Sequence, residues 1–208
     1  MSLRDLIRRE HQLLRRPLSI GARVLVLLAV VSLILALILP LWRIHLVAPQ
    51  YQEGLELNIY TYQLVAGNDG QDLHEINSLN HYIGMKPIEE ADFIEMRWVP
   101  FAIGIFILLA LRACLIGSIG SLVDLLALFL YFTAFSLGSF YYRLYSYGHQ
   151  LDPRAPVRIE PFTPVMIGKQ KIANFVQSSW PDIGTLPLAL FPLLLIAAMW
   201  VSRRDPLT

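Results

Sequence analysis

The chain has 208 residues, of which 55% are hydrophobic, and a formal net charge of +1. A soluble domain of this size rarely combines such a composition with apolar runs of about twenty residues, so a soluble enzyme or signalling domain is disfavoured. The single cysteine, Cys114, excludes an internal disulfide framework. Basic residues flank the apolar runs and do not interleave with aromatic residues, which argues against a nucleic-acid partner.

Four apolar segments are candidate membrane spans, because a spanning helix needs about 20 apolar residues. They cover residues 20–42, 98–116, 121–142 and 186–201. The sequence therefore predicts a mainly α fold, a polytopic membrane protein with about four transmembrane helices. We expect the first segment to be a retained anchor, because its apolar run is too long for a cleaved signal peptide.

Charge near the chain ends predicts the orientation. The tail at residues 1–19 carries five arginines and is expected to form an amphipathic helix on the membrane surface, or else a solvated basic anchor. The tail at residues 202–208 carries Arg203 and Arg204. By the positive-inside rule both termini are cytoplasmic in a bacterial inner membrane, which places the long loops, residues 43–97 and 143–185, outside.

The two outer loops differ in charge and are expected to fold together. Loop one carries nine carboxylates between Arg43 and Arg97, whereas loop two has a basic excess. Alternation around Leu55–Tyr62 predicts a strand, and residues 72–82 predict a short helix. Four prolines between Pro153 and Pro164 predict an extended second loop. We therefore expect a small mixed α/β outer subdomain built from both loops.

Histidine and methionine side chains in the outer loops are candidate copper ligands. His74 and His81 are two helical turns apart, and Met85 follows His81 at i+4, so a helix would place all three on one face. Imidazole and thioether groups suit Cu(I), and His149 and Met166 of loop two could complete the site. The alternative is that these residues pack at a subunit contact, which is the commoner role of such side chains.

The positions of the histidines in the chain argue against a transmembrane haem. Bis-histidine ligation requires a histidine in each of two spanning helices. The five histidines are His11, His45, His74, His81 and His149, and none lies in the middle of a predicted span.

Two ionisable residues lie inside the predicted spans. Arg112 and Asp124 are each six residues from Ser118, so a helical hairpin that turns there places them at equal depth. We expect a structural ion pair, with a proton or ion path as the alternative.

Two strings in the outer loops resemble a known family. They are NDGQDLHEINSLNHYIGMKPI at residues 68–88 and GHQLDPRAPVRIEPFTPVMIGKQKIANF at residues 148–175. They are similar to a family of small four-span bacterial membrane proteins associated with the accessory genes of nitrous oxide reductase, a periplasmic copper enzyme. The resemblance implies a role in copper supply or in assembling an exported redox enzyme, and it supplies no functional residues.

The sequence contains no phosphate-binding loop, nucleophile elbow or metalloprotease motif, so we expect no enzymatic activity. The first hypothesis is a membrane accessory protein that handles copper or assists assembly of an exported redox enzyme. The alternative is a structural subunit of a larger redox or photosynthetic membrane complex whose outer loops dock a partner. Both imply membrane lipid and other membrane or periplasmic subunits as partners. A transporter ranks lowest, because four spans leave little room for a pathway.

Overall fold

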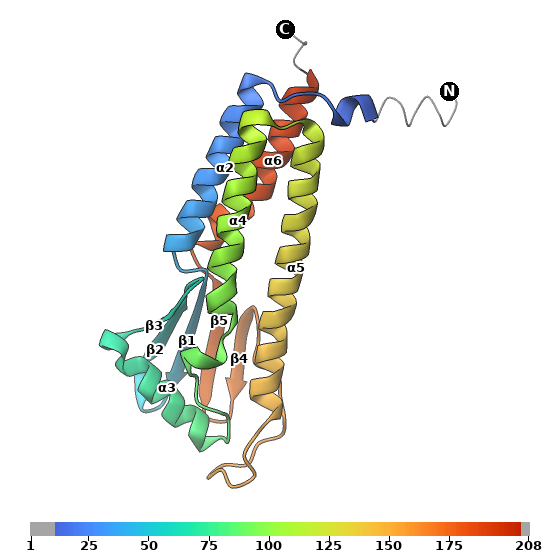
Figure 1. The fold of residues 1–208 in the computed structure, drawn as a ribbon. Coiled ribbons are helices and arrows are strands. Elements are labelled where there is room, and N and C mark those ends of the chain that lie inside the picture. Colours follow the sequence, from blue (N-terminus) through green and yellow to red (C-terminus); the bar gives the residue numbers. More distant parts are fainter. Residues whose placement is uncertain (1–10, 205–208) are drawn as a thin grey trace. The chain divides into compact units, whose positions relative to one another are not determined.

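The computed structural model describes residues 11–204 (Figure 1). Within this range four helices are long and apolar enough to cross a membrane: α2 (Ile20–Ile38), α4 (Glu95–Ile116), α5 (Ile119–His149) and α6 (Thr185–Arg204). Their length and composition indicate a membrane protein, and they confirm the four predicted helices. Most of the amphipathic helix expected in the N-terminal tail falls outside the described residues.

Two helix ends differ most from the sequence-based expectation, and the others lie within three residues of it. Helix α2 ends at Ile38 rather than at residue 42, because Pro40 cannot continue the hydrogen-bond ladder and disfavours helix at the residue before it. Helix α5 continues to His149 rather than ending at residue 142, because no proline follows until Pro153.

The chain divides into two compact units. One, the helical unit, contains Phe101–Ala134 and the described parts of Met1–Ala36 and Leu186–Thr208. The other, the sheet unit, contains Leu37–Pro100 and Phe135–Thr185. Every apolar helix contributes to the helical unit, whereas both long loops belong to the sheet unit.

Small and aromatic side chains form the core of the helical unit. Helix α2 buries Ala22, Ala29 and Ala36, which recur every seven residues and permit close helix packing. Phe129 of α5 stands at the centre of an aromatic group. Its ring lies 5.4 Å from that of Phe106 and 4.7 Å from that of Phe191, so α4, α5 and α6 meet there.

Polar contacts hold one end of the helical unit together. The Arg16 side chain donates to the Arg203 carbonyl at 3.0 Å, and the Ile119 amide donates to the Arg16 carbonyl at 3.0 Å. The Ser19 amide donates to Ser202 Oγ at 3.1 Å. The start of α2, the α4–α5 turn and the end of α6 therefore lie at the same end, as expected for four antiparallel spans.

The sheet unit contains one five-stranded antiparallel sheet in the order β3-β2-β1-β5-β4. Its strands are β1 (Trp42–Ala48), β2 (Tyr51–Ile59), β3 (Leu64–Ala66), β4 (Gly168–Ile172) and β5 (Phe175–Pro181). The central pairing, β1 with β5, joins the two loops in a register that sets Val47 opposite Val176. Loop two is thus extended only through its proline-rich part, up to Pro164, and then forms the β4–β5 hairpin.

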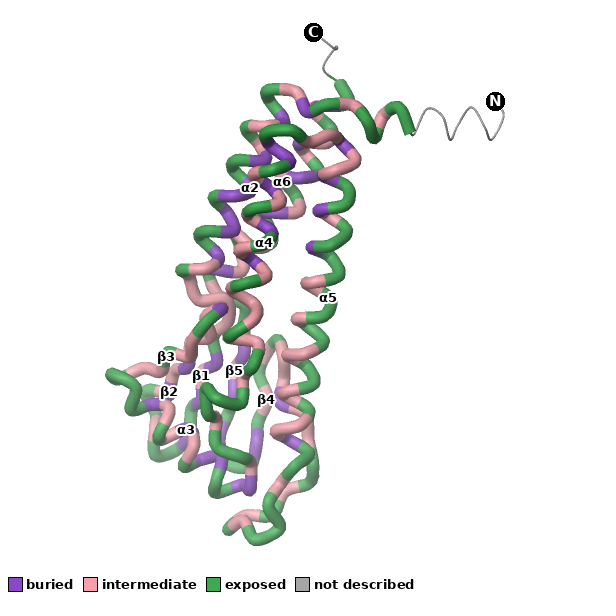
Figure 2. The backbone as a smooth tube through the Cα atoms, in the orientation of Figure 1, coloured by how far each residue is buried: buried purple, intermediate pink, exposed green. Residues whose placement is uncertain are grey.

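One face of this sheet is covered by helix α3 (Gln71–Tyr82), which lies within one residue of its predicted bounds. Alternate residues of β1 and β2, including Leu46 and Leu57, pack with Ile76 of α3 in a buried cluster. Short 3-10 turns, η1 (Asn68–Gly70) and η2 (Glu90–Asp92), flank α3 in the chain. Figure 2 shows buried positions on both the strands and α3, so this side is the core of the sheet unit.

Candidate functional site

The three candidate copper ligands of loop one do not share a helix face. Helix α3 ends at Tyr82, and Gly84 adopts the left-handed conformation with φ +83°. Met85 is therefore turned toward the sheet, where it packs against the buried cluster, while His74 and His81 stay exposed. The expected i,i+4 relation of His81 and Met85 is wrong, because the glycine turn redirects the chain between them.

The two candidates of loop two also have local partners. His149 is the last residue of α5, and its ring stacks on Tyr145 at 3.8 Å while Nδ1 lies 3.0 Å from the Tyr145 carbonyl oxygen. Met166 lies in the approach to β4, and its carbonyl accepts a hydrogen bond from Ser179 Oγ at 2.8 Å. Within residues 11–204 there is no group of three or more His, Cys, Asp or Glu side chains that could hold a metal ion.

The second face of the sheet, opposite α3, is the most distinctive surface of the sheet unit. We call it the open face. Side chains that point to it alternate with the buried ones and remain accessible: Trp180 is 50% exposed and Val176 is 39% exposed. The cross-strand register forms two rows on this face. One contains Lys171, Val176 and Val47, and the next contains Lys169, Ser178 and His45. The face therefore combines apolar side chains with a basic edge on β4.

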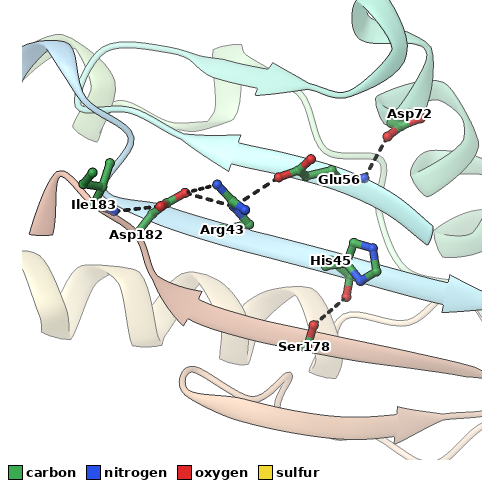
Figure 3. A network of polar contacts seen from close by, with 7 residues as sticks. All are labelled: Arg43, His45, Glu56, Asp72, Ser178, Asp182 and Ile183. Carbon is green, nitrogen blue, oxygen red and sulfur yellow. Dashed lines mark hydrogen bonds and ion pairs between the residues drawn. The ribbon is translucent and has the colours of Figure 1, made fainter. Parts of the chain in front are cut away.

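A charged network ties three strands together on the open face (Figure 3). Arg43 of β1 lies 3.1 Å from the carboxylate of Glu56 on β2 and 2.9 Å from that of Asp182, which follows β5. Exposed pairs of this kind contribute little each to stability. Lys169 and Lys171, in contrast, have no ion-pair partner within 4.0 Å in the described part of the chain, so the β4 edge keeps its positive charge.

Asp72 completes the hydrogen bonding of β2 where β3 ends. Strand β3 pairs only with Leu57–Ile59. Beyond it, Asp72 Oδ2 accepts the Glu56 amide at 2.8 Å, and Oδ1 accepts the side-chain amide of Asn68 at 2.7 Å. The side chain is 3% exposed, so this carboxylate is a buried structural group of the first turn of α3.

A small cavity of about 70 Å³ lies on the covered side of the sheet. Its walls are mostly apolar, and Asn80, Gln177 and Arg143 supply the polar groups. Arg143 is engaged with Glu95 at 3.2 Å, and Asn80 Nδ2 is buried without a hydrogen-bond partner among the described residues. A space of this size holds only a few water molecules.

Arg112 and Asp124 line one cavity of about 150 Å³ in the helical unit. The ion pairs within 4.0 Å in residues 11–204 do not include these two side chains, so the expected direct pair is not formed. The prediction placed them correctly on one surface of the hairpin, but a cavity takes the place of the contact.

The open face was missed by the sequence analysis. Its signal was the alternation in β1, where Ile44 and Leu46 are buried while Arg43 and Val47 are exposed. The predicted first span extends to Trp42, and this conceals the pattern. The pairing of β1 with β5 has no local signal, because the paired residues are about 130 positions apart in the chain.

Comparison with known proteins gives no family for this chain. No family model matches it, no curated protein matches it, and no solved structure matches it. Its function must therefore be inferred from the surfaces of its own two units.

Proposed function

We propose that the chain is a non-enzymatic accessory protein of the bacterial inner membrane that assists the assembly of an exported redox enzyme by docking it on the open face of the sheet. The observation that carries this proposal is that face itself, with exposed Val47, Val176 and Trp180 beside the unpaired Lys169 and Lys171. Aromatic and apolar anchors surrounded by polar residues are typical of protein–protein interfaces.

The orientation follows from charge near the helix ends. Arg15 and Arg16 precede α2, and Arg203 and Arg204 end α6, at the same end of the helical unit. The positive-inside rule makes this end cytoplasmic. The chain passes between the two units at residues 36–37, 100–101, 134–135 and 185–186, all of them away from this end, so the sheet unit lies outside the cytoplasm.

The positive charge of the β4 edge indicates the charge that the partner's surface should carry. Lys169 and Lys171 stand in successive cross-strand rows next to Ser178 and Val176. Two unpaired lysines beside an apolar centre fit a partner surface with an apolar patch and adjacent carboxylates, since complementary charge orients the encounter.

Copper handling is the second candidate function, and exposed His74 and His81 favour it. They lie seven residues apart on α3, about 10 Å along the helix axis at 1.5 Å per residue. A copper ion held by either histidine would therefore take its other ligands from a molecule bound on the α3 side, opposite the open face.

The test is affinity purification from the native membrane, with identification of partners and metal analysis. Val176→Glu adds a charge between Val47 and Lys171 on the open face, and the matched control Ser78→Glu adds the same charge on the exposed side of α3. We expect an exported redox enzyme to co-purify with the unmodified protein and with Ser78→Glu, and to be lost with Val176→Glu.

Two results would overturn the proposal. If Val176→Glu retains the partner as well as Ser78→Glu does, the open face is not the docking surface. If the partner is a set of membrane subunits in fixed ratio, the chain is instead a structural subunit of a larger complex.

A further inference from the structure

The cavity next to Arg112 and Asp124 is built by two matching stripes of the α4–α5 hairpin. Helix α4 contributes positions 109, 112, 113 and 116, and helix α5 contributes positions 121, 124, 125 and 128. Each set follows the i, i+3, i+4, i+7 spacing of a single helix face. The two faces border a partly open cavity of about 150 Å³, and a cavity of about this size holds a benzene-sized molecule.

The two charges in this cavity lack partners. Within residues 11–204 neither Arg112 nor Asp124 has an ion pair within 4.0 Å or a side-chain hydrogen bond, and both residues are exposed and line the cavity. Charged residues in apolar spans are costly unless they are paired or hydrated, and they mark functional sites. A ligand that carries one charge of each sign would satisfy both.

The depth of the charges fits a lipid headgroup. Arg112 lies four residues before the end of α4 at Ile116, and Asp124 lies five residues after the start of α5 at Ile119. At 1.5 Å per residue, both are roughly 6–8 Å from the turn. The polar layer on each side of the hydrocarbon core is of about the same thickness. Leu109 and Leu128, one turn deeper, line the apolar part of the cavity.

We propose that this cavity binds the phosphoethanolamine headgroup of phosphatidylethanolamine from the leaflet that contains the α4–α5 turn. The guanidinium of Arg112 pairs with the phosphate, for which its planar array of donors is suited. The carboxylate of Asp124 accepts hydrogen bonds from the primary ammonium. The acyl chains extend along the leucine side of the hairpin.

The chemistry of both charges selects this headgroup over other common ones. A phosphocholine group carries a cation without N–H donors, so Asp124 loses its hydrogen bonds. A phosphoglycerol group carries no cation, so the Asp124 carboxylate stays unpaired beside a phosphate. With either of these other lipids the Asp124 carboxylate is left without its partner. This unfavourable interaction makes the site specific for the ethanolamine headgroup.

The experiment is a lipid titration of the purified full-length protein, read by native mass spectrometry and by the thermal midpoint. Phosphatidylethanolamine, phosphatidylcholine and phosphatidylglycerol of identical acyl chains are compared, with soluble phosphoethanolamine as a fourth ligand. We expect phosphatidylethanolamine to bind most tightly and to raise the thermal midpoint most. Arg112→Gln and Asp124→Asn should each weaken its binding about tenfold, the equivalent of one charge-assisted contact.

The matched control is Arg97→Gln, which removes an exposed arginine from the other end of α4, remote from the cavity. It should leave lipid affinity unchanged. Asp124→Asn provides a second readout, because it should abolish the preference for ethanolamine over choline while it retains phosphate binding through Arg112. The ratio of the affinities for the ethanolamine and choline lipids can be measured in Asp124→Asn even if Arg112→Gln is poorly folded.

Four outcomes would overturn the inference. Equal binding of the three lipids, or unchanged preference in Asp124→Asn, removes the headgroup site. Competition by soluble phosphoethanolamine at the lipid's own affinity identifies a soluble ligand rather than a lipid. If the double variant is more stable than either single variant in every lipid, the two charges serve each other as a direct ion pair.

Discussion

Asp72 is the residue whose removal should most disturb the edge of the sheet. Its carboxylate accepts the Glu56 amide and the Asn68 side chain, at 2.8 and 2.7 Å. A buried donor left without an acceptor costs about 1–3 kcal/mol. Asp72→Ala should therefore lower the free energy of unfolding by about 2 kcal/mol and accelerate hydrogen exchange at the Glu56 amide. Asp72→Asn should lower the free energy of unfolding by less, because the side-chain carbonyl oxygen of asparagine still accepts one hydrogen bond.

The control for Asp72 is Glu53→Ala. Glu53 is exposed on β2, and its carboxylate has no hydrogen-bond or ion-pair partner among the described residues. Denaturant titration of the detergent-solubilised protein should show little change for this variant. Equal losses for the two variants would mean that net charge, rather than the Asp72 hydrogen bonds, stabilises the edge.

Tyr51 gives the sheet unit a pH dependence in the alkaline range. Its hydroxyl donates to the Glu75 carboxylate, and this hydrogen bond, with burial and the negative charge of Glu75, raises the pKa of Tyr51 above its ordinary value of 10.0. Because the folded-state pKa is raised, the stabilisation is complete below pH 10 and is lost as the pH rises through the raised pKa. The stability difference between the unmodified protein and Tyr51→Phe should be constant from pH 7 to 9 and shrink above about pH 10. A difference that grows with alkaline pH would contradict this assignment.

Two of the three glycines in helix α5 should respond in opposite ways to substitution by alanine. A Cβ at Gly148 would lie 1.8 Å from the Phe162 carbonyl oxygen, whereas one at Gly138 would meet nothing within 4 Å. Gly148→Ala should destabilise the protein by about 2–3 kcal/mol, because backbone must move. Gly138→Ala should be neutral or stabilise by up to about 1 kcal/mol through helix propensity. Thermal denaturation of the two variants compares them directly, and similar midpoints would show that Phe162 does not pack against α5 as described.

The elements that the sequence predicted best are those with local signals. Apolar runs of sufficient length predicted all four helices, and alternation at Leu55 and Leu57 predicted β2. The β1–β5 pairing was not predictable, since register between distant strands is set by burial of one whole face rather than by any local pattern.

In the candidate metal site, too, the positions set by local sequence were predictable and those set by distant contacts were not. His74 and His81 were correctly placed on one helix, because their spacing is a local property. Met85 was misplaced because Gly84 begins a turn whose direction depends on packing: a Cβ there would lie 2.8 Å from the Asp152 carbonyl of loop two. Contacts between loops decide such positions, and one sequence does not reveal them.

The whole molecule is expected to cross the membrane four times with both long loops on the outside. Reporter fusions at Gly67 and Pro164 should give an exported signal, and a fusion after Arg204 should give a cytoplasmic one. The basis is the arginine bias at the α2 and α6 ends that meet through Arg16 and Arg203. A cytoplasmic signal from either loop would reverse or break the topology.

Docking on the open face is tested most directly by site-specific photocrosslinking in intact membranes. A photoreactive residue at Val47, Val176 or Trp180 samples the open face, and one at Ser78 samples the exposed side of α3. The account predicts one discrete crosslinked product from all three open-face positions, containing the same exported enzyme, and none of it from Ser78. The same product from Ser78 alone, or equal yields from both surfaces, would contradict the assignment of the open face as the docking site.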